Sequence, residues 1–414
     1  MKSARFVVLL CLATALTCAP EKEHNWERAK TLSQELEAAP IGTATIAAPL
    51  YRRSNHVVAD TTYFYVQQLE SISNALLSYP PVVGGSMCAS TVERSLQNRI
   101  SDVLSVKDFG AVGDGATDDS AALNAAFTQA ALTSGTLLII PPATYGIKST
   151  LTIGNNFSIL AGKYVTILAL TGMTVMANVG TAGSTDAQTG YKGSMTGLSW
   201  NCNSLSTDGI HLGSVSPVTN VYANGYRFGS DKVLNCPGSG VTVGGNAWMD
   251  EFDGLVAMRN GNGVHLMPDS TGGANIAFYS SNFSDNAVGL NIAPIPNIAG
   301  SESAVYVYGS SFGDNTSWAI RNGDTTLDAW LYAAQLFSCF GCLIEQPTNW
   351  LSNDGMASFY GSYFQNGSGS GTLGWLIQNG GVLNINGGRV SNGGKGATFR
   401  PGDAKVTTQQ VVGM

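Results

Sequence analysis

The chain has 414 residues, of which 44% are hydrophobic and 12% charged, with a formal net charge of −7. This apolar content excludes a disordered chain, and the 50 glycines argue against a mostly helical one, because Gly in a helix interior costs about 1 kcal/mol relative to Ala. An acidic chain without a Lys or Arg run is not expected to bind nucleic acid.

The first 19 residues have the features of a signal peptide. Lys2 and Arg5 form a basic start, and residues 6–16 are mostly apolar but too short to span a bilayer. The sequence therefore predicts a secreted protein without a membrane span. A buried apolar element at the chain end is the alternative, and cleavage before Cys18 would make a lipoprotein.

Residues 20–104 are predicted to form a separate, partly helical head or stalk. Residues 21–40 are charged and suit a helix, and residues 63–77 keep apolar side chains at helical spacing. The composition changes near Ser105 to short β-type runs broken by Gly, Asn, Asp and Ser. We expect the main domain over residues 105–400 and a tail over residues 401–414.

The main domain begins with Ser-Val-Lys-Asp-Phe-Gly-Ala-Val-Gly-Asp-Gly-Ala-Thr-Asp-Asp at residues 105–119. An Ala-rich helix is expected over residues 120–131 and a strand over residues 136–140. A solenoid needs its open end covered, and this amphipathic helix can cover it. We therefore interpret the acidic residues of the motif as structural, with two of them capping the helix. They are Asp114, Asp118 and Asp119.

An internal repeat follows the cap. The strings Gly-Ile-His-Leu, Gly-Val-Thr-Val, Gly-Val-His-Leu and Gly-Leu-Asn-Ile begin 31, 23 and 26 residues apart, at positions 209, 240, 263 and 289. A second series, Asn-Phe-Ser-Asp-Asn, Ser-Phe-Gly-Asp-Asn and Tyr-Phe-Gln-Asn-Gly, begins at positions 282, 311 and 363. Short strands at this period predict an all-β solenoid whose coils share one core, with Gly and Asn at positive-φ corners. The alternative is an antiparallel β-sandwich. In the solenoid, one core row is expected to contain Ile210, Val241, Val264 and Leu290.

The cap motif, with its helix and the Pro-Pro-Ala-Thr-Tyr that follows at residues 141–145, resembles the start of the pectate-lyase-like β-helix superfamily. That superfamily includes polygalacturonases, rhamnogalacturonase-type enzymes and phage tailspike depolymerases. The resemblance implies a right-handed parallel β-helix and a polysaccharide partner. Residues 92–104 are similar to the segment that joins head to β-helix in tailspikes. The resemblance to tailspikes implies that the protein forms a homotrimer. It also gives the virion tail as the alternative to secretion.

One string resembles a polygalacturonase active-site motif. Ser-Thr-Asp-Gly-Ile-His at residues 206–211 has Ser where that family has Asn, and makes Asp208 a candidate catalytic residue. The family next has Gly-Asp-Asp, and the nearest match is Gly-Ser-Asp, ending at Asp231. Gly-Ser-Gly, with Ser239 at its centre, replaces the family's Gly-His-Gly. Similar strings also arise from the repeat itself.

The densest acidic cluster is Asp-Glu-Phe-Asp at residues 250–253. If Phe252 points into the core, strand alternation turns Glu251 and Asp253 together toward solvent. Sugar hydrolysis uses two carboxyl groups, so both are candidate catalytic residues. A solvated turn is the alternative.

Three further side chains are candidates for substrate binding: His211, Trp248 and His265. The two His residues share one place in the repeat, so both can simply be outward positions, and tryptophans commonly serve packing. A lyase would instead need a basic group, which Arg227, Lys232, Arg259 or Arg321 could supply. No cofactor or metal motif is evident. The pair Cys339 and Cys342 suits either a disulfide or two small buried positions.

These observations predict a polysaccharide-cleaving β-helix protein, either a glycoside hydrolase or a lyase. The alternative is a non-catalytic glycan-binding adhesin or tail fibre. Carboxylate geometry separates the two, because only the enzyme needs an outward pair of acids at catalytic distance.

Overall fold

The computed structural model describes residues 103–182, 193–213, 215, 221–267, 275–292, 304–323, 336–345, 349–353, 355–365, 375–378, 382–391, 398–401 and 405–409. The chain divides into two compact units, Met1–Asp102 and Val103–Met414, and every described residue belongs to the second. The predicted signal peptide therefore lies outside the described residues, as does the head except for its last two residues.

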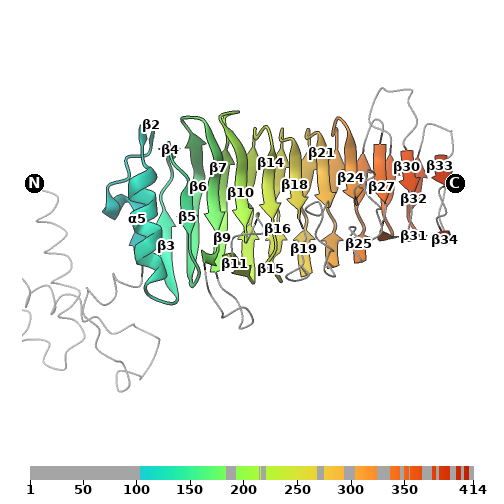
Figure 1. Ribbon diagram of the computed structural model, residues 1–414, viewed down its shortest axis with the longest axis horizontal. Coiled ribbons are helices and arrows are strands. Elements are labelled where there is room, and N and C mark those ends of the chain that lie inside the picture. The colour runs from blue at the N-terminus through green and yellow to red at the C-terminus, as the bar shows by residue number, and fades with distance from the viewer. Residues whose placement is uncertain are drawn as a thin grey trace, which may run out of the picture. The chain divides into compact units, whose positions relative to one another are not determined.

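The described strands form three stacks of parallel strands, and the chain visits the stacks in turn on each coil (Figure 1). The first stack contains β1 (Val103–Ser105), β3 (Thr136–Ile140), β12 (Tyr226–Gly229), β16 (Glu251–Asp253), β19 (Asn275–Tyr279), β22 (Ala304–Tyr308), β25 (Leu336–Phe340), β28 (Met356–Tyr360), β31 (Val382–Asn386) and β34 (Lys405–Gln409).

The second stack contains β2 (Asp114–Asp118), β4 (Thr144–Ile147), β13 (Lys232–Leu234), β17 (Val256–Met258), β20 (Asn282–Ser284), β23 (Ser311–Gly313), β26 (Leu343–Glu345), β29 (Tyr363–Gln365) and β32 (Arg389–Ser391). The long strands β6 (Phe157–Ala169) and β9 (Gly193–Asn201) pass through both the first and the second stack.

The third stack contains β5 (Leu151–Ile153), β7 (Met173–Val179), β10 (Ser206–Leu212), β14 (Ser239–Val243), β18 (Asn262–Leu266), β21 (Val288–Ile292), β24 (Trp318–Asn322), β27 (Asn349–Asn353), β30 (Trp375–Gln378) and β33 (Thr398–Pro401). A small separate sheet is formed by β8 (Thr181–Ala182), β11 (Val221–Asn224) and β15 (Ala247–Trp248).

The parallel solenoid predicted from the repeat is confirmed. Ile210 aligns with Val241, Val241 with Val264, and Val264 with Leu290, all in the third stack. All four side chains are buried. The alternative of an antiparallel sandwich is wrong, because among the described strands the antiparallel pair is β8 with β11, outside the three stacks.

The repeated Gly positions lie inside the third stack and are not its corners. Gly209, Gly240, Gly263 and Gly289 do not have positive φ angles. A Cβ at Gly240 would lie 2.7 Å from the Gly263 carbonyl oxygen and 2.8 Å from the Asn260 amide nitrogen. These glycines therefore allow close approach of neighbouring coils. The predicted positive-φ corners occur between the first and second stacks at Gly254, Gly309, Gly341 and Gly361, and between the second and third stacks at Asn235.

The second repeat series places buried asparagines at the corner between the second and third stacks. Asn286 Oδ1 accepts a hydrogen bond from the Asn260 backbone N–H at 3.0 Å, and its Nδ2 donates to the Ala257 carbonyl at 3.0 Å. Asn315 accepts from the Asn286 backbone N–H at 3.1 Å. These three asparagines, which we call the asparagine ladder, satisfy backbone groups that face the core, where an unpaired group would be costly.

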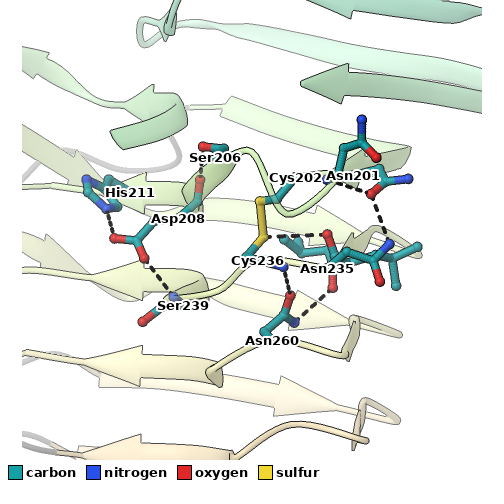
Figure 2. The surroundings of a disulfide bond; sticks show 12 residues. Asn201, Cys202, Ser206, Asp208, His211, Asn235, Cys236, Ser239 and Asn260 are labelled. Atoms are coloured by element: carbon teal, nitrogen blue, oxygen red, sulfur yellow. Dashed lines mark hydrogen bonds and ion pairs between the residues drawn. A yellow bond between two sulfur atoms is a disulfide. The ribbon is translucent and has the colours of Figure 1, made fainter. Parts of the chain in front are cut away.

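A disulfide lies at the first coils of the asparagine ladder. Cys236 donates its backbone N–H to Asn260 Oδ1 at 2.9 Å, as Asn260 does to Asn286. Figure 2 shows its sulfur bonded to Cys202 on the preceding coil. The pair Cys339 and Cys342 is both buried and disulfide-bonded, so the two roles weighed for it coexist.

The predicted cap helix is confirmed as α5 (Ser120–Ala131), which follows the short 3-10 helix η4 (Val106–Phe109). Asp118 accepts the Ser120 backbone N–H at 3.1 Å, as expected of a cap. Asp119 makes no side-chain cap for α5; it accepts the N–H groups of Val112 and Gly113 at 2.6 and 3.0 Å. The acidic residues of the motif therefore hold the capping loop, as structural residues would.

Candidate functional site

Strand β16 places two carboxyl groups on the outer face of the first stack. Phe252 is fully buried between the rings of Phe228 and Phe278, with ring centroids 4.6 and 4.9 Å apart. Glu251 is half-buried and Asp253 exposed. The strand alternation predicted for this cluster is thus confirmed. Two residues along a strand have Cα atoms about 6.6 Å apart, and the carboxyl groups of inverting glycosidases are about 6.5–9.5 Å apart.

Arg227 fixes one of these carboxylates. It lies beside Glu251 in the register of β12 and β16, and its Nε donates to Glu251 Oε2 at 2.8 Å. The Arg227 and Glu251 side chains keep 62% and 40% of their surface exposed, so the ion pair contributes little to stability, about 0–1 kcal/mol.

A hollow of about 460 Å³ opens around these side chains, on the outer face of β9, β12, β16 and β19. It is lined by Ser194, Thr196, Arg227, Phe228, Gly229, Glu251, Asp253 and Tyr279. Tyr279 follows Asp253 in the register of the first stack. Partial burial, and then the neighbouring Glu251 carboxylate, raise the pKa of the Tyr279 hydroxyl, so it is a neutral phenol at neutral pH.

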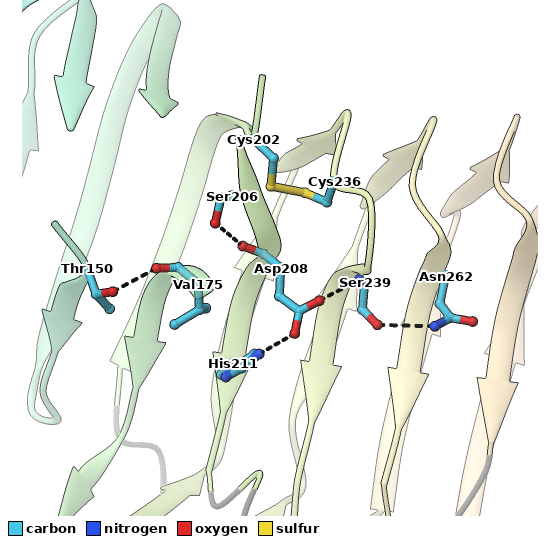
Figure 3. Close-up of polar contacts among 9 residues, drawn as sticks. All are labelled: Thr150, Val175, Cys202, Ser206, Asp208, His211, Cys236, Ser239 and Asn262. Carbon is cyan, nitrogen blue, oxygen red and sulfur yellow. Dashed lines mark hydrogen bonds and ion pairs between the residues drawn. A yellow bond between two sulfur atoms is a disulfide. The ribbon is translucent and has the colours of Figure 1, made fainter. Parts of the chain in front are cut away.

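Asp208 lies on a different stack. It is on β10, where His211 Nε2 is 2.7 Å from its Oδ2 and the Ser239 backbone N–H donates to its Oδ1 at 2.6 Å (Figure 3). The Ser239 hydroxyl in turn accepts from Asn262 Nδ2 at 3.2 Å. Asp208, Ser239 and Asn262 therefore form one polar row on three successive coils of the third stack.

The environment of Asp208 favours its charged form. Burial by itself raises the pKa of Asp208, but the hydrogen bonds with His211 and the Ser239 backbone, together with the electrostatic influence of His211 and His265, outweigh it and bring the pKa below its ordinary value. The Asp208 side chain keeps 20% of its surface exposed. It can therefore accept a proton or a hydrogen bond from a ligand, but it is a poor proton donor near neutral pH.

His211 and His265 occupy the outward positions that the repeat predicted. Both align with Thr242, which stands between them on the third stack. Trp248 lies on β15, and its backbone N–H donates to Asn224 Oδ1 at 3.2 Å. Trp248 is not among the residues that line the hollow. Trp200 and Trp350 are fully buried and serve packing.

The structure divides the predicted catalytic set in two. Glu251 and Asp253 share the hollow of the first stack, whereas Asp208 is paired with His211 on the third stack. Asp231, the carboxylate nearest to the expected Gly-Asp-Asp triplet, is fully buried and accepts the Leu198 N–H at 2.8 Å, so it does not face a substrate. Burial raises its pKa well above the ordinary value.

Sequence reasoning missed the polar and aromatic walls of the hollow. Ser194 and Thr196 come from β9, and Tyr279 from a coil beyond Asp253. Only the register between coils aligns Ser194 with Arg227 and Glu251, and Thr196 with Gly229 and Asp253. Among the described residues, no three His, Cys, Asp or Glu side chains gather closely enough to hold a metal ion. None of the described helices is long and apolar enough to cross a membrane.

Comparison with known proteins supports the resemblance seen in the cap. Residues 103–209 match the family model described as rhamnogalacturonase A/epimerase, pectate lyase-like. The matched range contains the cap and Asp208 but ends before Glu251 and Asp253. No curated protein sequence matches the chain.

Solved structures share the fold at low sequence identity. The Geobacillus virus E2 protein ORF18 superposes with a TM-score of 0.53 and 14% identity, over 78% of this chain and 66% of the viral one, so the match spans slightly less than two thirds of the viral protein. The A-module of mannuronan C-5 epimerase AlgE4 from Azotobacter vinelandii has a TM-score of 0.51 and 15% identity, over 75% of this chain and 96% of the module. The predicted resemblance is supported: residues 103–209 match the pectate-lyase-like family model, and the solved structures share the fold.

Proposed function

We propose that the solenoid binds a polysaccharide in the hollow of the first stack and hydrolyses it there. The observation that supports this function is the pair of outward carboxyl groups, Glu251 and Asp253, two residues apart on β16 and both in the wall of the hollow, because hydrolysis of a glycosidic bond uses two carboxyl groups. The pectate-lyase-like family match makes a carbohydrate the natural ligand class.

The roles follow from the contacts of each carboxyl group. Glu251 is oriented by Arg227 at 2.8 Å, and we assign it the part of the base that activates a water molecule. Asp253, exposed on the same strand face, would protonate the oxygen of the leaving sugar. Thr196 and Ser194, across the hollow, can hydrogen-bond to sugar hydroxyls.

The test begins with the purified protein and a panel of glycans. New reducing ends would reveal hydrolysis, and absorbance of unsaturated uronates would reveal a lyase. Proton NMR of the first product would show inverted anomeric configuration if water attacks directly. Hydrolysis with retention would contradict the assigned roles, and unsaturated products would exclude hydrolysis.

Amide variants then locate the chemistry. Glu251→Gln and Asp253→Asn should each lower the rate by about 10²–10⁴-fold, because each removes an acid or base from the reacting bond. Asp285→Asn is the matched control, since Asp285 is an exposed corner carboxylate outside the hollow, at a positive φ that Asn also adopts. Hydrolysis that survives both hollow variants but fails in Asp208→Asn would move the site to the third stack.

A non-catalytic glycan binder is the second candidate. One observation favours it: the Asp208 row contains a single carboxylate, together with His211, Ser239 and Asn262, which suits hydrogen bonding to hydroxyls better than acid–base chemistry. Retention of a glycan without any product, unchanged in the amide variants of the hollow, would support this function against the first.

We also propose that the protein is exported. Disulfides form and persist mainly in oxidising compartments, and two link Cys202 to Cys236 and Cys339 to Cys342. Mass spectrometry of the mature protein, before and after thiol alkylation, tests both the cleavage of residues 1–19 and the disulfides. Free thiols at these four positions in the native protein would contradict export. Sedimentation equilibrium of the same sample tests the homotrimer expected from the tailspike resemblance.

A further inference from the structure

A row of aromatic rings runs along the outer face of the first stack, starting at the hollow. Tyr279, Tyr308, Phe340 and Tyr360 align in register on four successive coils. Their ring centroids are 5.1, 4.9 and 4.9 Å apart, and successive ring planes differ by 7, 9 and 9°. The rings therefore stack face to face along the direction in which the coils follow one another.

The two inner rings of the row are covered on both faces, whereas the first ring is covered by a neighbouring ring on one face. Tyr308 and Phe340 have a ring against each face. Tyr279 has Tyr308 against one face, and its other face is turned toward the preceding coils, where Asp253 and then Gly229 occupy the same register. Tyr279 is 37% exposed and forms part of the wall of the hollow.

The space beside this ring face is shaped by the residues before it. Gly229 has no side chain and lines the hollow, and the Thr196 hydroxyl lies close beside it, since a Cβ at Gly229 would be 3.1 Å from Thr196 Oγ1. Asp253 and the Arg227–Glu251 ion pair stand along the same side. The arrangement combines one flat apolar surface with several hydrogen-bonding groups at its edge.

This combination fits a pyranose ring. The C–H groups of one sugar face pack on an aromatic ring, while the hydroxyl groups at its rim need donors and acceptors. The hollow contains one cation and two anions, so its charge opposes a uronate carboxylate. The row beyond it carries Ser338 and Ser358 beside the rings and no charged group at these aligned positions. A neutral sugar is therefore the favoured ligand.

We propose that Tyr279 is the stacking platform for one pyranose unit of a neutral polysaccharide, with its plane fixed by the three aromatic rings behind it. This inference rests on the proposed function, since it places a glycan in the same hollow. It adds the class of sugar and the residue that holds it.

Affinity electrophoresis tests this proposal with defined probes. Gels would contain dextran, laminarin or galactomannan as neutral polymers, and alginate or polygalacturonate as acidic ones. We expect the parent to be retarded by a neutral polymer. Tyr279→Ala should bind that polymer about tenfold more weakly, which corresponds to about 1.4 kcal/mol for one lost stacking contact. Tyr279→Phe keeps the ring face and should bind within about twofold of the parent.

Tyr360→Ala is the matched control. Tyr360 lies at the other end of the same row, is 40% exposed and stacks on Phe340 as Tyr279 does on Tyr308, but it is outside the hollow. Thermal melts would verify that both Ala variants remain folded. Equal loss of binding in the two variants, undiminished binding of Tyr279→Ala, or retardation by the acidic polymers alone would overturn the inference. A parent retarded in none of the gels would contradict the proposed function itself.

Discussion

The asparagine ladder provides a quantitative test of what holds the coils together. In Asn286→Ala, the Asn260 backbone N–H loses its partner at 3.0 Å inside the core, and the Ala257 carbonyl loses one hydrogen bond of 3.0 Å. A buried N–H left unpaired costs about 1–3 kcal/mol and a lost hydrogen bond about 0.5–1.5 kcal/mol, so the variant should lose about 2–4 kcal/mol of unfolding free energy. Urea denaturation followed by far-UV circular dichroism would measure this difference.

The control for this experiment is Asn262→Ala. The Asn262 side chain is half-buried on the outer face and bonds only to the Ser239 and Asn291 side chains in the third stack, so its removal should cost less than about 1 kcal/mol. Asn286→Asp adds a second check, because the carboxylate cannot donate to the Ala257 carbonyl and should destabilise the protein more at pH 7 than at pH 4. Equal costs for Asn286→Ala and Asn262→Ala would refute the ladder's role.

Three other variants test the disulfides, Asp208 and Arg227. Replacing Cys202 and Cys236 with Ser removes a disulfide between residues 34 apart and should cost about 3–4 kcal/mol of unfolding free energy. The same replacement of Cys339 and Cys342, which are only 3 apart, should cost about 2 kcal/mol, because the disulfide closes a shorter loop. The reverse order of costs in denaturant melts would contradict the loop-entropy reasoning. The folded pKa of Asp208 is depressed, so its contribution to stability is present above about pH 4 and is lost as the pH falls through the folded pKa. The difference in unfolding free energy between the parent and Asp208→Asn should therefore shrink in acid. A difference that does not change between pH 7 and pH 2 would be inconsistent with this reasoning. Arg227→Gln should change the unfolding free energy by less than about 1 kcal/mol, because the ion pair is exposed. It should still lower the rate of hydrolysis, because Arg227 orients Glu251. An unchanged rate would show that Arg227 is not part of the site.

The sequence predicted the elements whose determinants are local. The cap helix over residues 120–131 and the core row through Ile210, Val241 and Val264 could be read from periodicity, because a strand's inward positions repeat within a few residues. Alternation around Phe252 likewise placed Glu251 and Asp253 outward.

Register between coils could not be read in the same way. The separation of Asp208 from Glu251 depends on which strand of each coil a residue occupies, and coil lengths vary with the connecting segments. The start-to-start spacings of β16, β19, β22, β25 and β28 are 24, 29, 32 and 20 residues (251, 275, 304, 336, 356). The alignment of Tyr279 with Tyr308 and Phe340 depends on the same register.

The order of the coils has a mechanical consequence. In the described part of the chain, the strands of each coil pair with those of the coil before and the coil after, so the solenoid can open from an end one coil at a time. A force applied at the C-terminus should release lengths of about 70–110 Å in successive steps, since 20–32 residues extend by about 3.3–3.6 Å each. The Cys202–Cys236 bond would shorten the step at its coil until a reductant cuts it, so single-molecule pulling with and without dithiothreitol would locate that coil along the unfolding trace.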